Sequence, residues 1–375
     1  MKQVIIHAGF PKTATSSIQK TCANNRDELE KLGLYYPLFK LDNKVIINHS
    51  FPFGSLFTSK PEEYHGNIRM GVDVSATNKK YEEQLNHVLS QEYTKIVISG
   101  EGICGLSESE LDQAITKMQS YGYKVRLIMF IRPPLSFINS AIQQKIKGGH
   151  CIERFNILSI MDVIGKIESV FPEAEFFSFT DACQHKHGPV GYFLEIIGVD
   201  DFSNLEFCRS NDSISAQVTR LISFINREQP FFIQGRKKNP FRRNTDTREF
   251  WKIEGDKFQA NQNEMKRFES QINKDNQYLL SQFGASFCDN KTFAQIKTQS
   301  NEWSDEQLKQ LKQIIPKVDK NIKLIAYDYF KNIICLDKHK LSHIFLKNNQ
   351  NCVISNTKLA KSPKKEREKK ELIFK

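Results

Sequence analysis

Three short runs of consecutive apolar residues constrain the fold of this 375-residue chain more than any other feature. Residues 4–6 (VII), 95–101 (KIVISGE) and 124–132 (KVRLIMFIR) lack the alternation of a half-exposed strand. Each therefore predicts a strand that is buried on both faces. Further strands are predicted at 33–37 and 172–179, and helices at 79–92, 107–121 and 188–199. Strands that alternate with helices predict an α/β fold with a doubly wound parallel sheet.

Polar residues follow the three apolar runs. His7 to Lys12 come after the first run, Glu101 ends the second and Arg132 ends the third. Ligands of open parallel sheets bind beyond the carboxyl ends of the strands. We therefore expect these residues to converge on one crevice.

The segment after the first strand combines one lysine with several hydroxyl groups. Gly9 and Pro11 interrupt the chain, and a helix is predicted to begin at Thr15 or Ser16. The amides of a helix N-terminus bind anions, and the charge of Lys12 adds to them. The hydroxyl donors are Thr13, Thr15, Ser16 and Ser17. The pattern predicts a phosphate or sulfate cradle; the alternative is an ordinary helix N-cap.

The sequence PKTATS does not fit the common phosphate loop, because Pro11 stands where that motif has glycine. It resembles instead the 5′-phosphosulfate loop of sulfotransferases that use 3′-phosphoadenosine-5′-phosphosulfate (PAPS). That loop reads proline, lysine, a hydroxyl residue, glycine and two further hydroxyl residues; here Ala14 replaces the glycine, which restricts positive φ. The resemblance implies that PAPS is the sulfuryl donor. The residues implied to bind it are Pro11, Lys12, Thr13, Ala14, Thr15, Ser16 and Ser17.

A second segment, IRPPLSFINS, resembles the 3′-phosphate site of the same family. Arg132 ends a strand, Pro133 and Pro134 suit the first turn of a helix, and Ser140 follows eight residues after the arginine. The resemblance implies that the Arg132 guanidinium and the Ser140 hydroxyl bind the 3′-phosphate. Taken alone, the same spacing also fits a surface arginine and an unrelated helical serine.

The resemblance to bacterial glycan-type sulfotransferases covers most of residues 1–287, which we expect to form the sulfotransferase domain. It implies a P-loop-like doubly wound parallel sheet flanked by helices. Beyond the resemblance, we expect a helical, basic C-terminal extension. Residues 288–354 match no familiar pattern, and one helix is predicted from Ser304 to near Pro316. Residues 321–336 fit either a helix or a strand. We expect the basic tail, 355–375, to be disordered.

Sulfuryl transfer requires positive charge at the departing phosphate oxygen and a base that takes the proton of the acceptor. Lys12 suits the first role. Glu101 is the first candidate for the base, although it could instead pair structurally with Lys12 or Arg132. His49 is the second candidate, whereas His7 lies too close to the loop. No metal-ligand spacing is present, so no metal is expected.

The predicted function is transfer of the sulfuryl group of PAPS to a hydroxyl or amine of an acceptor, expected to be a carbohydrate glycan or another hydroxylated small molecule. The alternatives are a P-loop-type kinase that uses ATP and a non-catalytic polyanion-binding protein. The net charge is +11, to which the tail contributes eight lysines and arginines against three glutamates, a net +5. Residues 235–244 form a second basic cluster. The tail suggests weak contact with an anionic surface, whereas residues 235–244 are the better candidate for contact with an anionic ligand or acceptor. No specific nucleic-acid partner is expected.

Neither a membrane-spanning run nor a signal peptide is recognisable, so a cytoplasmic protein is expected. The eight cysteines are scattered without close pairs, which predicts reduced thiols. The sequence does not indicate an oligomeric state or a particular acceptor.

Overall fold

The computed structural model describes residues 2–152, 156–209, 213–233, 237–243 and 245–345. Its centre is a parallel sheet of five strands in the order β2-β5-β1-β6-β7. These strands are β1 (Gln3–His7), β2 (Leu34–Tyr35), β5 (Lys95–Ser99), β6 (Lys124–Ile131) and β7 (Glu175–Ser178). Four of them lie within the predicted strand segments, and β1 extends the predicted run 4–6 by one residue at each end. The α/β class and the parallel sheet are therefore confirmed.

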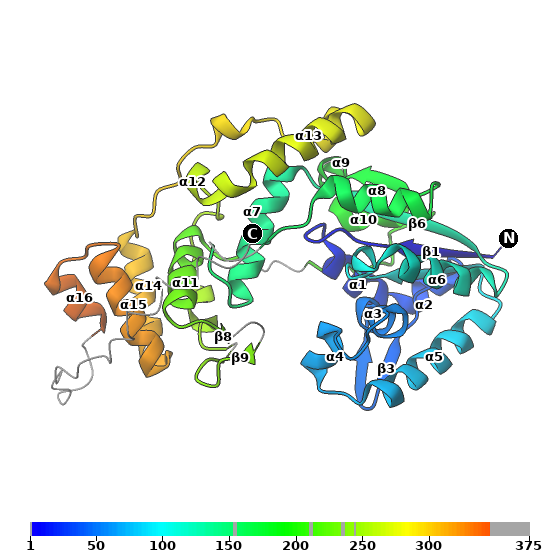
Figure 1. Ribbon diagram of the computed structural model, residues 1–375, viewed down its shortest axis with the longest axis horizontal. Helices are drawn as coiled ribbons and strands as arrows, with labels where there is room; N and C mark the ends of the chain where they lie inside the picture. The colour runs from blue at the N-terminus through cyan, green and yellow to red at the C-terminus, as the bar shows by residue number, and fades with distance from the viewer. Residues whose placement is uncertain (1, 153–155, 210–212, 234–236, 244, 346–375) are drawn as a thin grey trace, which may run out of the picture.

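Both faces of the sheet are buried, as the continuous apolar runs require. Ile5 and Val97 face one hydrophobic core, whereas their neighbours Ile6 and Ile98 face the other. One core holds α1 (Thr15–Asn24), α2 (Arg26–Lys31) and α10 (Gly188–Ile196); the other holds α5 (Val74–Ser90), α6 (Glu108–Gln119) and α8 (Ile160–Val170). Helices thus cover both faces, so the sheet is doubly wound (Figure 1).

Two further predicted helix boundaries are also observed. α6 begins at a capping box in which the Ser107 amide donates to Glu110 Oε2 at 2.9 Å. α7 (Pro134–Lys147) starts with proline in its first turn and buries Leu135, Ile138, Ile142 and Ile146. This apolar stripe faces the hydrophobic core, and α7 lies between the sheet and the C-terminal helices (Figure 1).

The C-terminal part of the described chain is helical and packs on α11 (Ala216–Glu228). α14 (Asp305–Ile314) begins at the predicted cap, where Ser304 and Gln307 form a capping box. The segment that fitted helix or strand is helix α15 (Lys320–Asn332), because Ile322, Ala326 and Tyr329 recur at helical spacing and are buried. α16 (Lys338–Phe345) follows. The predicted disordered tail, 355–375, lies outside the described residues.

Other elements complete the chain. They are hairpins β3–β4 (Phe39–Leu41, Lys44–Ile46) and β8–β9 (Phe232–Ile233, Lys237–Lys238), and helices α3 (Ser50–Phe57), α4 (His65–Met70), α9 (Phe179–Gln184), α12 (Gln262–Met265) and α13 (Glu269–Phe283). α13 crosses back over α7 to the sheet (Figure 1).

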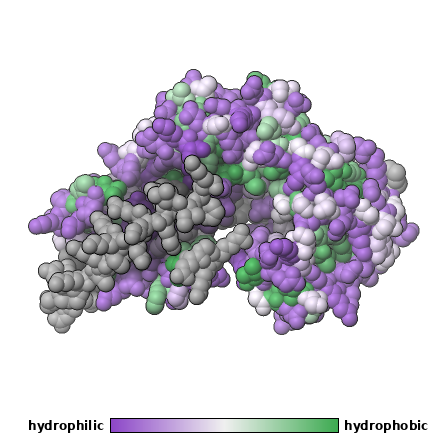
Figure 2. Space-filling view, in the orientation of Figure 1, coloured by the Kyte–Doolittle hydropathy of each residue, from purple (hydrophilic) through white to green (hydrophobic). Residues whose placement is uncertain are grey.

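Hydrophilic side chains cover most of the face drawn in Figure 2. Within the described part of the chain, no helix combines the length and apolarity needed to cross a membrane. The seven cysteines described there are free thiols.

Candidate active site

The loop between β1 and α1 has the backbone of an anion cradle. Lys12 and Ala14 adopt left-handed conformations, with φ of 69° and 61°, on either side of Thr13. Within the described residues, the amides of Ala14, Thr15 and Ser16 donate to no protein acceptor, whereas the Thr13 amide closes a turn over Pro11 and Lys12 and the Ser17 and Ile18 amides bond to the Ala14 carbonyl. Loops with alternating left-handed residues form concavities that bind anions. In the described part of the chain, three successive unpaired donors at the start of α1 give this loop the geometry of such a site.

Ala14 takes the conformation for which glycine is the usual residue. It is the N-cap of α1 and its side chain makes no capping hydrogen bond. A left-handed conformation costs an L-residue about 1 kcal/mol relative to glycine. The loop keeps the left-handed geometry despite the alanine, and the rest of the fold offsets this cost.

The predicted hydroxyl donors differ in their environments. Thr13 Oγ1 donates to the Phe10 carbonyl at 2.5 Å and braces the loop from within. Ser16 is exposed, whereas Ser17 is buried. Thr15 Oγ1 is buried and has no hydrogen-bond partner among the described residues. Buried hydroxyl groups are rarely left unpaired, so Thr15 is the hydroxyl best placed to donate to a bound anion.

Gly9 lies where the chain beyond β1 comes close to the start of α1, and this close contact requires a residue without a side chain. A Cβ on Gly9 would lie 2.7 Å from Thr15 Oγ1 and 3.3 Å from the His7 ring. No larger residue would fit without displacing Thr15. Gly9 therefore allows the Thr15 hydroxyl to lie against the loop backbone.

Arg132 joins the loop to the end of β6. Its Nη1 donates to the Lys12 carbonyl at 2.9 Å and its Nε donates to Ser136 Oγ at 2.8 Å. The guanidinium also lies 5.4 Å from the centroid of the Phe179 ring. Burial lowers the pKa of Arg132, although an arginine remains charged at physiological pH. The two predicted phosphate-binding segments are thus in direct contact.

Arg132 donates to a serine of α7 other than the one predicted to bind the 3′-phosphate. Ser136 makes the hydrogen bond, whereas Ser140 is half-buried one turn further along α7 and has no hydrogen-bond partner in the described chain. Ser136 lies four residues from Arg132 and Ser140 eight, so both belong to the same side of the helix. Ser140 keeps its hydroxyl available for a ligand, while Ser136 orients the guanidinium.

A distant carboxylate caps α7. Asp289 Oδ2 accepts the Leu135 amide at 2.7 Å and the Asn276 side-chain amide at 3.2 Å. Burial raises the pKa of Asp289, and these hydrogen bonds oppose that rise. No local sequence pattern indicates this contact, because 154 positions separate Asp289 from Leu135.

Glu101 follows β5, between two glycines that pack tightly on Ser50. The Gly102 amide donates to Ser50 Oγ at 2.9 Å, and a Cβ on Gly100 would lie 2.6 Å from the Ser50 nitrogen. The Glu101 side chain reaches solvent, yet the surrounding protein desolvates it and raises its pKa, while the nearby Lys12 ammonium lowers it in part. A carboxylate with a raised pKa next to a cation can accept a proton from a bound molecule.

Lys12 lies between the loop and α7. Its ammonium donates to Gln144 Oε1 at 3.4 Å, near the C-terminal end of that helix. The same ammonium acts electrostatically on Glu101. Lys12, Glu101 and Arg132 therefore surround one region beyond the strand ends, as predicted.

His7 and His49, the two histidines considered as the base, are buried and uncharged. His49 Nδ1 accepts the Ser99 amide at 2.9 Å, and Nε2 lies 2.8 Å from the Pro37 carbonyl, to which it donates. Burial lowers the pKa of His49 to about 4 and that of His7 to about 3. His49 has no ring nitrogen left to take a proton from an acceptor substrate. Its two hydrogen bonds link β5 to the segment around Pro37.

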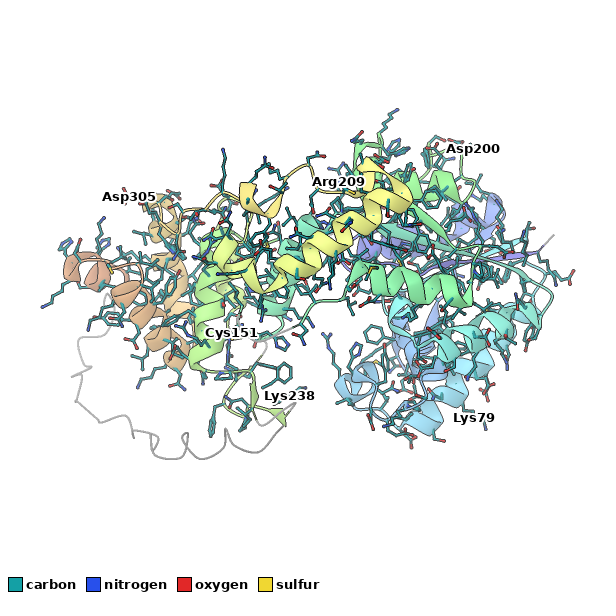
Figure 3. The ribbon with its side chains drawn as sticks, turned by 45° about the horizontal axis from the view of Figure 1, so that its top comes forward. Lys79, Cys151, Asp200, Arg209, Lys238 and Asp305 are labelled. Atoms are coloured by element: carbon teal, nitrogen blue, oxygen red, sulfur yellow. The ribbon has the colours of Figure 1, made fainter. Side chains whose placement is uncertain are left out.

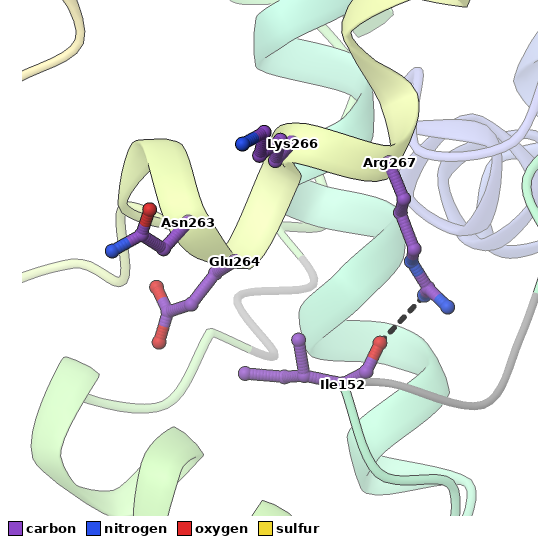
Figure 4. A pocket seen from close by; sticks show the side chains of 5 residues that line it. All are labelled: Ile152, Asn263, Glu264, Lys266 and Arg267. Atoms are coloured by element: carbon purple, nitrogen blue, oxygen red, sulfur yellow. Dashed lines mark hydrogen bonds between the residues drawn. The ribbon is translucent and has the colours of Figure 1, made fainter.

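No group of three or more histidine, cysteine, aspartate or glutamate side chains within the described ranges is arranged to hold a metal ion. A hollow of about 540 Å³ lies elsewhere, lined by Ile152, Asn263, Glu264, Lys266 and Arg267 (Figure 4). Arg267 Nη2 donates across it to the Ile152 carbonyl at 2.5 Å. None of the strand-end residues lines this hollow, so it is separate from the candidate site.

Comparison with known proteins gives no relative. No protein-family model, curated protein or solved structure matches this chain.

Proposed function

We propose that this protein is a PAPS-dependent sulfotransferase with a P-loop-like nucleotide site at the carboxyl ends of its central strands. The observation that carries the proposal is the loop from Lys12 to Ser16. In the described chain, three of its amides, those of Ala14, Thr15 and Ser16, have no acceptor and the buried Thr15 hydroxyl has no hydrogen-bond partner. These donors fit the oxygens of a phosphosulfate group, and the neighbouring arginine fits a second phosphate.

Each residue then has a defined task. The amides of Ala14, Thr15 and Ser16 and the Thr15 hydroxyl would bind the 5′-phosphosulfate, and Arg132 with Ser140 would bind the 3′-phosphate. PAPS supplies the sulfuryl group when bound. Lys12 would stabilise negative charge at the bridging oxygen, because its ammonium lies beside the loop.

Glu101 would remove the proton of the acceptor hydroxyl or amine during in-line displacement. It is exposed to solvent, and its raised pKa makes it a stronger base than an ordinary glutamate. We do not assign this task to His49, because both ring nitrogens are engaged within the fold. The acceptor is expected to be a carbohydrate.

Nucleotide binding tests this proposal directly. Adenosine 3′,5′-bisphosphate should raise the melting temperature of the protein, whereas ATP at the same concentration should not. Incubation with labelled PAPS and a panel of glycans should then yield a sulfated product. Stabilisation by ATP alone would favour a kinase instead. Salt-sensitive polyanion binding without any nucleotide effect would favour a non-catalytic binder.

A further inference from the structure

The turn that carries Glu101 is held by the first residue of α3. The Gly102 amide donates to Ser50 Oγ at 2.9 Å, and the Tyr64 hydroxyl donates to the Ser50 carbonyl at 2.8 Å. Ser50 is buried, and a Cβ on Gly100 or Gly102 would lie only 2.6 Å from its nitrogen or 2.9 Å from its Cβ, respectively. Ser50 thus packs against the residues on both sides of the proposed base.

Asn48 connects Ser50 to α1, the helix that begins at the anion-binding loop. Asn48 Oδ1 accepts the Ser50 amide at 2.9 Å and also accepts from Gln19 Nε2 at 3.2 Å. Gln19 is a buried residue of α1. Its Nε2 donates in addition to the Ser99 carbonyl at 3.1 Å, two residues before Glu101. One side-chain amide of α1 therefore contacts both segments that hold the proposed base.

Other contacts fix the chain before and after the Glu101 turn. The Gly100 amide donates to the His7 carbonyl at 3.1 Å, where the chain leaves the sheet. Lys166 Nζ donates to the Cys104 carbonyl at 2.5 Å, beyond the turn. Ser50 acts on the residues between these two points. Its hydroxyl is therefore the side-chain contact that is nearest in sequence to the proposed base.

In-line transfer requires a precise distance between the base and the bound sulfuryl group. In the proposed site the sulfuryl group lies at the start of α1, whereas the base follows β5. The packing of α1 against the Glu101 turn therefore sets the alignment of the two groups. A displacement of about 1 Å can lower the rate of such a reaction by roughly 100-fold.

We propose that Ser50 and Asn48 are positioning residues, which hold the Glu101 carboxylate at a fixed distance from the anion-binding loop. Ser50 fixes the turn that carries the carboxylate, and Asn48 links Ser50 to α1. Both act through Glu101 and contact no reacting group. The inference rests on the proposed sulfotransferase function for the reaction that the carboxylate serves, whereas the hydrogen bonds themselves are independent of it.

A double-mutant cycle tests whether Ser50 acts through Glu101. S50A removes the acceptor of the Gly102 amide and should lower the kcat of sulfuryl transfer by roughly 10- to 100-fold, with unchanged affinity for adenosine 3′,5′-bisphosphate. In E101Q, which lacks the base, S50A should lower kcat by less than about twofold. A purely structural role would lower kcat equally in both backgrounds, and that result would overturn the inference.

Ser55 provides a matched control on the same helix. It is buried like Ser50, but it lies roughly 140° around α3 from Ser50. It bonds to Asn78 of α5, the residue before Lys79, which is labelled in Figure 3. S55A should lower the melting temperature, as S50A does, yet leave kcat unchanged. Equal losses of kcat in S50A and S55A would contradict a specific role for Ser50.

Two substitutions test Asn48. N48A leaves the Ser50 amide and the Gln19 side chain without their shared acceptor, so it should lower kcat several-fold. N48D keeps the oxygen that accepts both bonds and should recover most of the rate. A normal kcat in N48A would remove Asn48 from the positioning network.

Carboxyl NMR of Glu101 requires neither nucleotide nor acceptor. With ¹³C-labelled glutamate, and with E101Q to identify the signal, a pH titration follows this carboxyl group in the full-length protein. In the wild type and S55A, burial should keep the pKa of Glu101 above its ordinary value. In S50A the loosened turn admits water, so the pKa should fall towards that of an ordinary glutamate. Identical titration in S50A and the wild type would overturn the inference.

The two measurements distinguish this inference from the proposed function. If S50A changes the titration of Glu101 while the wild type transfers no sulfuryl group to any glycan of the panel, the positioning of Glu101 stands and the sulfotransferase proposal fails. If the wild type transfers the group and S50A lowers kcat equally with and without the Glu101 carboxylate, the positioning role fails and the sulfotransferase proposal stands.

Discussion

The Arg132 guanidinium donates to the Lys12 carbonyl at 2.9 Å and so ties the end of β6 to the loop after β1. One side chain thereby sets the distance between two segments that are 120 residues apart in sequence. The bond uses one guanidinium nitrogen, and Ser136 accepts from a second. Arg132 has further donors, so it can support the loop and bind a ligand at the same time.

We expect Arg132→Ala to weaken binding of adenosine 3′,5′-bisphosphate by about 1.5–3 kcal/mol, because a charge-assisted phosphate contact is lost and the loop loses its support. Isothermal titration calorimetry measures this change. Lys124→Gln, an exposed change at the start of the same strand, is the control and should bind normally. Equal affinity in Arg132→Ala and the wild type would remove Arg132 from the nucleotide site.

Ala14→Gly should stabilise the protein by up to about 1 kcal/mol, because glycine adopts the left-handed conformation without steric cost. Ala23→Gly, in the last turn of the same helix, should have the opposite effect, of up to about 1 kcal/mol. Urea unfolding of both variants measures the sign of each change in the free energy of unfolding. Destabilisation by both would show that Ala14 is not strained.

Glu101→Gln should lower the rate of sulfuryl transfer by roughly 10²–10⁴ and leave nucleotide affinity nearly unchanged. Its effect on stability should be favourable at neutral pH. Burial raises the pKa of Glu101 above 4.5, so the folded protein keeps this proton up to a higher pH than the unfolded chain does. The stability of the fold therefore falls as pH rises from the pKa of the unfolded chain to that of the folded protein. Glutamine removes that loss. Normal transfer by Glu101→Gln would place the base elsewhere.

His49 should make the protein sensitive to acid. The unfolded chain takes up this proton near pH 6.5, whereas burial lowers the pKa in the fold to about 4. The contribution of His49 is therefore complete above pH 6.5 and is lost progressively as pH falls towards 4. Urea unfolding between pH 7.5 and 4.5 should show a shallower pH dependence in His49→Asn. The exposed change His87→Asn should leave the slope as in the wild type, and identical slopes in all three proteins would contradict this account.

Asp289→Ala should destabilise the protein by about 1–3 kcal/mol, since it leaves the buried Leu135 amide at the start of α7 without an acceptor. Asp289→Asn keeps a carbonyl acceptor and should cost less. Asp305→Ala, exposed in the first turn of α14, is a matched control and should change stability by less than about 0.5 kcal/mol. Thermal or chemical unfolding ranks the three variants, and a cost for Asp289→Ala as small as that of the control would argue against the cap.

The sequence predicted those parts of the fold that local pattern determines. Continuous apolar runs located β1, β5 and β6, and Ser107 and Ser304 marked two helix starts, because capping depends on residues three positions apart. The convergence of Lys12, Glu101 and Arg132 also followed, since carboxyl ends of parallel strands share one edge. Helix α15 stayed undecided, because its apolar residues fit two periods over a short stretch.

Local sequence patterns did not predict the contacts between distant segments. The cap by Asp289 and the contact between Lys12 and Gln144 depend on how α7 packs, which no spacing in the sequence encodes. Likewise, Ser136 and Ser140 lie on the same side of α7, and only the packed helix shows which of them meets Arg132. The burial of both His49 nitrogens has the same origin.

The strand order has a consequence for hydrogen exchange. Lys12, Glu101 and Arg132 follow β1, β5 and β6, which are the three inner strands, and neither edge strand, β2 nor β7, contributes a residue. Amides of inner strands open to solvent only when the sheet separates, so they exchange with the free energy of global unfolding. The framework of the site should therefore persist through fraying of the edges and disappear only when the whole domain unfolds.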